Sequence, residues 1–436
     1  MRTAKRTAAC RAAPALVALV SAMVSPASAV DEGIVQATGK PAEGPLEAFL
    51  AQPLFDLQVV FEGDKVREPY LAVATDGTIL VIQNRIGHLR RSEDGGNTWS
   101  EVFHVPIRHS DSNVIVDEAT GDLFSLRLWD ARDRMFRSID GGKTWSEQQI
   151  KVKLGGLANH LQQVGPKRRG PRNKPTHGTY YLHANASEAG ITLRHGKHRG
   201  RLIVTATFRP HAKEHPSDRK PVDAIYSCAV YSDDGGRTWC VSEVFPEGYT
   251  EEAALVELHD GRIYYNTRSH KGFYDTSRAR PLAPDEVLRR EAWSYDGGQT
   301  WKDYRISKLL PDGGGHNRGY GMKGGLVRLP VKGRDILIFS NADTAGGPRE
   351  RLTVWASFDG GNTWPLKRLI YPGPAAYSSL GAGRPATPGE GKVFLLFEGG
   401  PQAPYSAMHV ARFNLAWLLE GTRTGDGRVP EWLNRE

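Results

Sequence analysis

Short apolar runs separated by polar turns recur along most of this chain. Two examples are 224–231 (AIYSCAVY) and 351–356 (RLTVWA), which are rich in β-branched and aromatic residues. Such runs predict short β-strands, because branched and aromatic side chains pack well on a pleated surface. The 48 glycines and 10 tryptophans agree with many strands joined by tight turns. The pattern therefore favours an all-β propeller, sandwich or barrel over an α/β enzyme.

Two segments favour a helix instead. The segment 283–293 (APDEVLRREAW) has Pro284 near its start, where a helix tolerates proline. A second, short helix is expected over 414–420. These helices are too few to change the expected all-β class.

One octet, S-x-D-G-G-x-T-W, occurs five times and is called the Asp box below. The copies span 92–99, 138–145, 232–239, 294–301 and 357–364. Within each box, the Asp carboxylate and the Ser and Thr hydroxyls can bond to the backbone of the turn, and the glycine pair supplies positive φ. The Trp is expected to leave the turn toward a neighbouring sheet, where its large ring buries apolar area. We therefore interpret the boxes as structural hairpin turns.

Repetition of these boxes predicts sheets arranged radially around an axis. Boxes one and two start 46 residues apart and boxes two and three start 94 apart, so the longer gap has room for a sheet without a box. Five marked sheets and one unmarked sheet predict a six-bladed β-propeller of four-stranded antiparallel sheets. We expect residues 30–436 to form this one domain.

The first 29 residues have the pattern of a signal peptide. Four basic residues precede the small, apolar stretch 12–24, and Ala27-Ser28-Ala29 matches a cleavage site. The apolar stretch is too short to span a bilayer, and no other segment reaches the length that a span needs. We therefore expect a secreted or periplasmic protein without a membrane span.

Removal of residues 1–29 changes the charge and the cysteine count. Four of the 57 basic residues and no acidic residue lie there, which leaves a net charge of +4. That modest charge does not indicate a nucleic-acid partner. Cys10 is also removed, whereas Cys228 and Cys240 remain and flank one predicted turn. They could form a disulfide in an oxidising compartment, but the sequence does not fix their geometry.

Asp boxes alone indicate a fold and not an activity. The segment 66–85 (VREPYLAVATDGTILVIQNR) resembles the first strand pair of bacterial exo-sialidases, which opens on an Arg-Ile-Pro motif. Arg67 falls on the first carboxylate-binding arginine of that family. The segment 251–270 resembles the part that carries the catalytic glutamate and the second arginine, which match Glu252 and Arg268.

The resemblance continues to the C-terminal part of the chain. The segment 338–364 is similar to the strand before the last Asp box of that family, and Arg349 falls on its third arginine. The segment 376–399 resembles the closing part, where Tyr377 matches the nucleophile. Glu398 matches the acid that supports the first arginine. The resemblance implies a six-bladed sialidase fold and a retaining exo-α-sialidase acting on terminal sialic acid or a related 2-keto acid sugar.

The chemistry of these residue types fits that implication. Three arginines can bind a sugar carboxylate through charge-assisted hydrogen bonds. A neutral tyrosine is not repelled by the substrate carboxylate, and sialidases are known for using one as nucleophile. A free tyrosine has a pKa near ~10 and needs a base. The resemblance gives that role to Glu252, acting on Tyr377.

The pattern departs from the family at the general acid. The family has an aspartate on a loop soon after the first strand pair, but 84–91 (NRIGHLRR) contains no Asp or Glu. His88 could act as the acid, since imidazole titrates near neutral pH. Asp111, from a neighbouring loop, is a second candidate. Alternatively, the leaving group needs no acid or the substrate is not a sialoside.

The sequence predicts no metal site and no cofactor. Each Asp box has one invariant acid, whereas calcium loops space several oxygen ligands. His211 and His215 lie four apart, but in a Lys- and Pro-rich segment and not on an apolar-faced helix. The expected partners are sialylated or other acidic glycans, and we expect a monomer. The alternatives are a non-catalytic glycan-binding propeller and an enzyme acting on uronic-acid polysaccharides; an assembly-factor or receptor-type propeller is disfavoured by the arginine set.

Overall fold

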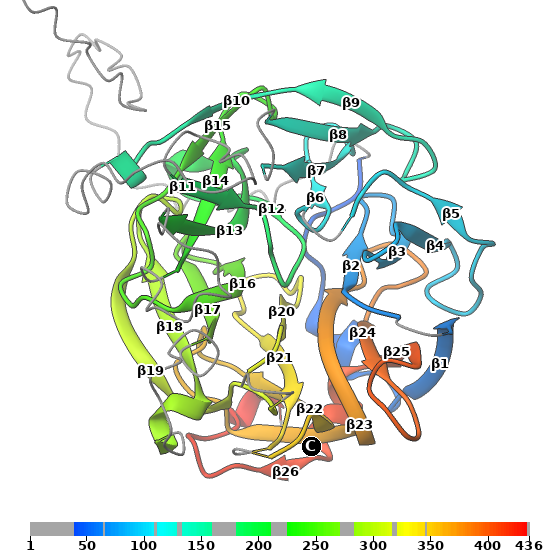
Figure 1. The fold of residues 1–436 in the computed structure, drawn as a ribbon. Coiled ribbons are helices and arrows are strands. Elements are labelled where there is room, and N and C mark those ends of the chain that lie inside the picture. The colour runs from blue at the N-terminus through cyan, green and yellow to red at the C-terminus, as the bar shows by residue number, and fades with distance from the viewer. Residues whose placement is uncertain are drawn as a thin grey trace, which may run out of the picture.

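Small, mostly antiparallel sheets surround a central axis in the computed structural model (Figure 1). The structure describes residues 39–63, 66–108, 111–128, 133–158, 180–210, 225–270, 283–315, 321–344 and 347–433. The signal peptide predicted for 1–29 and the histidines at 211 and 215 lie outside these residues. Among the described residues, no helix combines the length and apolar character needed to cross a membrane. The all-β, propeller-like architecture predicted from the Asp boxes is confirmed.

Three of the sheets have four antiparallel strands each, in chain order from the centre outward. The first contains β2 (Pro69–Val73), β3 (Ile79–Gln83), β4 (His88–Ser92) and β5 (Phe103–His104). The second contains β6 (Ile115–Val116), β7 (Leu123–Arg127), β8 (Arg134–Ser138) and β9 (Ser146–Gln149). The third contains β16 (Thr250–Glu257), β17 (Ile263–Ser269), β18 (Leu288–Ser294) and β19 (Lys302–Pro311). These sheets have the expected meander topology.

A six-stranded sheet occupies the long gap between boxes two and three. It contains β10 (Lys151–Lys153), β11 (Tyr180–His183), β12 (Ile191–Thr192), β13 (Leu202–Pro210), β14 (Tyr226–Ser232) and β15 (Thr238–Val241). β10 adds to β15 in parallel, unlike the all-antiparallel expectation. The described strands of this gap thus join the sheet that carries box three. The additional sheet without a box, expected in this gap, is not formed by these strands.

The last sheet has eight strands and joins both ends of the described chain. It contains β1 (Phe55–Glu62), β20 (Gly325–Arg328), β21 (Leu337–Ala342), β22 (Glu350–Ser357), β23 (Leu366–Ala382), β24 (Val393–Gly399), β25 (Ala407–Phe413) and β26 (Thr422–Arg423). The long β23 pairs with β22 in its first part and with β24 from Ala375 onward. The N-terminal β1 pairs with β25. Because β23 is continuous, the sheets number five among the described residues, and the expectation of six four-stranded sheets is met only in part.

Helices are few and short among the described residues. The structure places 3-10 helices at η1 (Leu46–Leu50), η2 (Gly196–His198), η4 (Pro284–Val287) and η5 (Glu431–Leu433), and an α-helix at α3 (Leu415–Leu419). The short helix predicted over 414–420 is confirmed, and the Asn414 side chain caps it by accepting a hydrogen bond from Trp417 N. The helix predicted over 283–293 is wrong beyond its first turn. Residues 288–294 form β18 because Ala292 and Trp293 pack between sheets, which outweighs local helix propensity.

Each Asp box connects the third and fourth strands of its sheet, as the turn after β4, β8, β14, β18 or β22. In box one, Asp94 Oδ1 accepts hydrogen bonds from Ser92 Oγ at 2.8 Å and Thr98 N at 3.0 Å, and Oδ2 accepts one from Thr98 Oγ1 at 2.6 Å. Burial alone would raise the pKa of Asp94, but these bonds lower it to about 2. The carboxylate is therefore used within its own turn, as the structural interpretation predicted.

The second glycine of each box also contacts the preceding sheet. All five have positive φ, and a Cβ at Gly298 would lie 2.2 Å from Ile203 Cδ1. A Cβ at Gly142 would lie 2.5 Å from Leu80 Cδ2. The box tryptophans join the same apolar layers, and Trp364 is buried with Tyr264. The boxes thus attach each sheet to its neighbour through contacts that leave no room for a side chain.

The two cysteines near box three are not bridged to each other. Cys228 is a free thiol that is completely buried in β14. Burial raises the pKa of this thiol above its ordinary value. Cys228 therefore behaves as a small apolar core residue.

Candidate active site

Six residues singled out by the family resemblance lie together where the inner strands begin. Arg67 lies two residues before β2, Glu252 lies in β16 and Tyr377 lies in β23. The other three are Arg268 in β17, Arg349 just before β22 and Glu398 in β24. They come from three sheets that meet at the axis, so only the closed ring brings them together.

Tyr377 is at the centre of this group. Its hydroxyl lies 3.3 Å from Glu252 Oε1 and 3.2 Å from Arg268 Nη1. Burial and, next, the negative charge of Glu252 raise the pKa of Tyr377 to about 12. The hydroxyl is therefore protonated at neutral pH and has an acceptor for its proton within hydrogen-bond reach.

Glu252 is held as a carboxylate by its neighbours. Arg268 Nη1 donates a hydrogen bond to Glu252 Oε2, and both side chains are almost completely buried. Burial alone would raise the pKa of Glu252, but the positive charges of Arg268 and Lys323 hold it well below its usual range. Glu252 also has a φ of 52°, in the left-handed region that side chains rarely adopt. Such backbone strain is typical of functional positions.

Glu398 fixes Arg67 and the backbone of Tyr377 at once. Its Oε1 accepts a hydrogen bond from Arg67 Nε at 2.9 Å, and its Oε2 accepts one from Tyr377 N at 3.2 Å. Glu68 N also donates to Oε1 at 2.7 Å. Burial raises the pKa of Glu398, and the charge of Arg67 opposes this rise. Glu398 therefore orients the arginine and the tyrosine relative to each other.

Two arginines stand over the ring of Tyr377. The guanidinium carbons of Arg67 and Arg349 each lie 5.0 Å from the ring centroid. Arg349 also donates to Gly321 O at 2.7 Å and to Tyr405 Oη at 3.0 Å. With Arg268 at the hydroxyl, three guanidinium groups surround one tyrosine, an arrangement that can bind a carboxylate.

Three residues of the site were missed from the sequence. Glu68 and Lys323 form a buried ion pair, with Lys323 Nζ 2.6 Å from Glu68 Oε2 and 5.6 Å from the centroid of the Tyr377 ring. In the sequence, the acidic residue between Arg67 and Pro69 could have indicated this pair. Tyr405 lies in the loop between β24 and β25, where no pattern marked it.

Neither candidate for the general acid joins the group. His88 lies in β4, pairs with Gln83 and His104, and packs its ring edge-on at 4.7 Å against that of His104. Asp111 is completely buried, and Arg127 Nε donates to its Oδ1 at 2.6 Å. Arg127 Nη2 donates to the second oxygen at 2.5 Å. Both carboxylate oxygens of Asp111 are thus engaged by one guanidinium.

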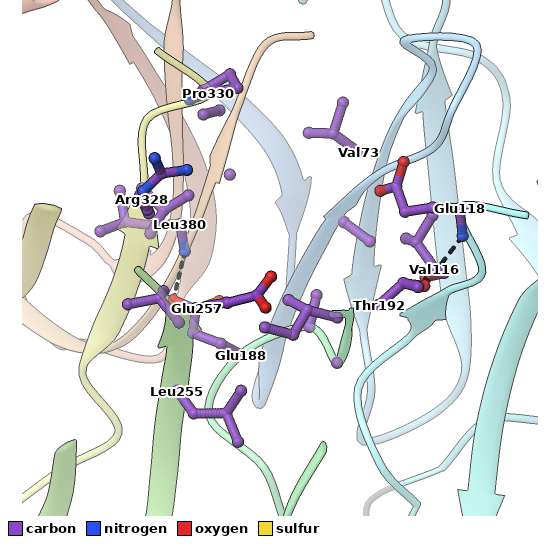
Figure 2. Close-up of a pocket in the computed structure, with 18 of the residues that line it drawn as sticks. Val73, Val116, Glu118, Glu188, Thr192, Leu255, Glu257, Arg328, Pro330 and Leu380 are labelled. Carbon is purple, nitrogen blue, oxygen red and sulfur yellow. Dashed lines mark hydrogen bonds between the residues drawn. The ribbon is translucent and has the colours of Figure 1, made fainter. Parts of the chain in front are cut away.

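A cavity of about 160 Å³ lies on the same axis but at the other ends of the inner strands (Figure 2). It is lined where β2, β16 and β20 finish, whereas the tyrosine site lies where these strands begin. Figure 2 shows Glu257 and Glu118 on opposite sides of it. Burial raises the pKa of Glu257 to about 7. None of the six residues around Tyr377 lines this cavity, so it is separate from the candidate site.

A metal site is not evident in the parts of the chain that the structure describes, where no three His, Cys, Asp or Glu side chains are grouped to hold an ion. The cationic groups around Tyr377 would also repel a metal ion.

Comparison with known proteins relates this fold and site to one family. The model of the BNR repeat-like domain matches residues 125–408. A sialidase from Micromonospora viridifaciens is 31% identical over 434 residues, which cover 93% of this chain and 59% of that protein. This chain therefore spans less than two thirds of the length of that relative.

Solved structures show the same fold at lower identity. The Hadza microbial sialidase Hz136 has a TM-score of 0.57 at 21% identity, with 81% of this chain and 66% of that chain covered. The intramolecular trans-sialidase from Ruminococcus gnavus, in complex with oseltamivir carboxylate, has a TM-score of 0.56 at 16% identity, with 83% and 98% covered. Fold and sequence together define an Asp-box propeller. The chain belongs to the BNR repeat-like family within the bacterial sialidase superfamily, as its sequence predicted.

Proposed function

We propose that this chain is a retaining exo-α-sialidase that releases terminal sialic acid, or a related 2-keto acid sugar, from glycans. One observation supports this most: a buried tyrosine hydroxyl lies 3.3 Å from a glutamate and 3.2 Å from an arginine. Two further arginines stand over the same ring. A carboxylate on the anomeric carbon fits the three guanidinium groups while that carbon faces the hydroxyl.

In the first step, the Tyr377 oxygen attacks the anomeric carbon as the bond to the leaving oxygen breaks. Glu252 takes the phenol proton, which it can do because it is ionised at neutral pH. The leaving oxygen takes its proton from an acid that lies outside the group described around Tyr377, or from solvent. In the second step, water displaces the tyrosine, whose oxygen regains the proton from Glu252, and the proton that the water loses passes to the conjugate base of the first-step acid or to solvent.

Arg67, Arg268 and Arg349 bind the substrate carboxylate in this proposal. Arg67 depends on Glu398, since a guanidinium on a flexible stem loses less entropy on binding when its Nε is already fixed. Arg268 has a second effect, because its charge near the Tyr377 hydroxyl favours the developing phenolate.

We also propose a six-bladed count for the propeller. The eight-stranded sheet divides at β23 into one unit of β20–β23 and another of β23–β25 closed by β1. Each unit then has four strands, with the short β26 added beside the first part of β23, and the second unit is the one without an Asp box. A signal peptide over 1–29 and export remain part of the proposal. N-terminal sequencing of protein recovered from the culture medium or periplasm would test both.

The activity is tested by cleavage of an aryl α-sialoside followed by fluorescence. The first-formed sugar anomer, observed by proton NMR, should be the α-anomer of the substrate, because two displacements retain configuration. An inverted first product would contradict the double displacement. Mass spectrometry of the product distinguishes hydrolysis, which gives the free sugar, from internal transfer, which gives an anhydro sugar.

A glycan-binding propeller without turnover is the second candidate, and the segment 84–91 favours it because it contains no carboxylate. Such a protein would bind sialosides on a glycan array yet release sugar from neither aryl nor natural substrates. Release from the aryl substrate alone would support an enzyme that depends on a good leaving group.

A further inference from the structure

Tyr405 contacts two of the three arginines that surround Tyr377. Its hydroxyl accepts a hydrogen bond from Arg349 Nη1 at 3.0 Å. Its ring lies against the Arg67 guanidinium, whose carbon is 4.3 Å from the ring centroid. That distance is shorter than the 5.0 Å between the same guanidinium and the Tyr377 ring. One side chain therefore connects the arginine just before β22 with the arginine two residues before β2.

The backbone of Tyr405 is fixed to the same part of the site. Val66 N donates a hydrogen bond to Tyr405 O at 3.2 Å, and Val66 directly precedes Arg67. Gly63 N donates to Ser406 O at 3.2 Å. The loop between β24 and β25 is thus attached, by backbone hydrogen bonds on both sides, to the chain that leads into β2 next to Arg67.

The two arginines need such a connection. Both guanidinium carbons lie 5.0 Å from the Tyr377 ring centroid and are therefore at most about 10 Å apart, a separation at which two positive charges repel each other. Glu398 balances Arg67 but makes no hydrogen bond to Arg349 among the described contacts. An aromatic face attracts one guanidinium and a hydroxyl accepts from the other, so Tyr405 offsets part of the repulsion.

Tyr405 is half-buried, whereas Tyr377 is buried, so it lies nearer to solvent. It can therefore hold the arginines before a carboxylate arrives and still border the path by which a substrate enters.

We propose that Tyr405 is a positioning residue that sets the separation of Arg67 and Arg349 and so determines selectivity for carboxylated sugars. The inference rests on the proposed function and assigns the preference for the carboxylate to a residue outside the family pattern. Its hydroxyl acts through Arg349 and its ring through Arg67. Removal of the hydroxyl alone and of the whole ring should therefore give graded effects.

The test compares Tyr405→Phe and Tyr405→Leu with the wild-type full chain. The binding probes are 2,3-didehydro-2-deoxy-N-acetylneuraminic acid and its methyl ester, measured by calorimetry. Loss of one hydrogen bond to a charged group should raise the Kd for the acid about fivefold in Tyr405→Phe. Tyr405→Leu should raise it further, to about 20-fold. The Kd for the ester should change less than about twofold, since the ester has no charge for the clamp to recognise.

Kinetics on an aryl sialoside provide the second measurement. KM should rise in the same order while kcat stays within about twofold, because the clamp binds ground state and transition state alike. Tyr371→Phe is the matched control. Its ring packs against Phe397 in the same sheet, and the described contacts include no hydrogen bond from its hydroxyl.

Equal loss of acid and ester binding, or unchanged acid binding in both variants, would overturn the role of Tyr405. If the wild type binds the acid but does not cleave the sialoside, the proposed hydrolysis is wrong. The comparison of acid and ester binding would still test the role of Tyr405. Failure of the wild type to prefer the acid over the ester would overturn both.

Discussion

The Asp-box turns and the Tyr377 site both depend on buried or hydrogen-bonded carboxylates, but they satisfy them differently. In box five, Asp359 accepts hydrogen bonds from Ser357 and Thr363, which lie within four residues of it. At the axis, Glu252 meets Tyr377 from 125 residues away. The box carboxylate is stabilised by hydroxyl and N–H groups of its own turn, whereas Glu252 is stabilised by the charge of Arg268. We therefore expect the boxes to contribute to stability and the residues at the axis to contribute to the proposed reaction.

The largest expected effect separates the two regions most clearly. Tyr377→Phe removes the nucleophilic oxygen and should lower kcat by about 1,000-fold or more on an aryl sialoside. Thermal unfolding should change little, because the ring and its packing remain. A fluorescence assay measures kcat, and calorimetry measures the melting temperature. Full activity in this variant would remove Tyr377 as nucleophile.

A box glycine should show the opposite behaviour. Gly298→Ala forces a Cβ to 2.2 Å from Ile203 Cδ1 at a φ of 84° and should cost about 3 kcal/mol of unfolding free energy. The matched control is Gly235→Ala, whose φ is 70° but whose Cβ meets nothing within 4 Å. It should cost only about 1 kcal/mol. Urea unfolding measures the unfolding free energy of both variants. Equal losses of free energy would show that the positive φ, and not the contact with Ile203, causes the destabilisation.

The box carboxylate gives a smaller effect. Asp359→Ala removes three hydrogen bonds in an exposed turn and should destabilise the fold by about 1 kcal/mol, since water replaces part of what is lost. The value of kcat/KM at 25 °C should stay unchanged. A fall in kcat/KM without a fall in melting temperature would mean that the box carboxylate affects the Tyr377 site directly and not through the stability of the fold.

The smallest expected effect concerns pH. Glu252 must be ionised to accept a proton, and its pKa lies below the ordinary 4.5 through Arg268 and then Lys323. Lys323→Met should raise that pKa, so kcat/KM at pH 4 relative to pH 7 should fall about threefold, because more Glu252 is protonated at the lower pH.

The double variant Lys323→Met with Glu68→Gln controls for the unpaired carboxylate that Lys323→Met leaves in the site. The double variant should show the same fall in kcat/KM at pH 4 relative to pH 7. Circular dichroism at both pH values verifies folding. An unchanged ratio of kcat/KM in both variants would contradict the effect of Lys323.

The two regions also differ in what the sequence could predict. Each box is complete within eight residues, so its turn, its glycines and its position after a strand could be read directly. The helix expected over 283–293 was wrong because burial of Trp293 between sheets is a tertiary effect. The pairing of Glu68 with Lys323 spans 255 residues and follows from ring closure alone. The six residues around Tyr377 were found through resemblance, since no local pattern distinguishes Arg67 from a surface arginine.

The pairing of β1 with β25 has a consequence for the order of folding. Asp56 and Arg412 form an ion pair across these strands although they lie 356 positions apart. β1 can therefore pair only after β25, close to the C-terminus, is available. Closing so long a loop is slow compared with pairing neighbouring strands within a sheet. Until β25 is available, Val60 and Phe61 of β1 lack a paired strand and lack Met408 and Val410, with which they are buried in the complete fold. A chain truncated before residue 407 would thus leave an open ring with an exposed apolar edge, the kind of intermediate that aggregates.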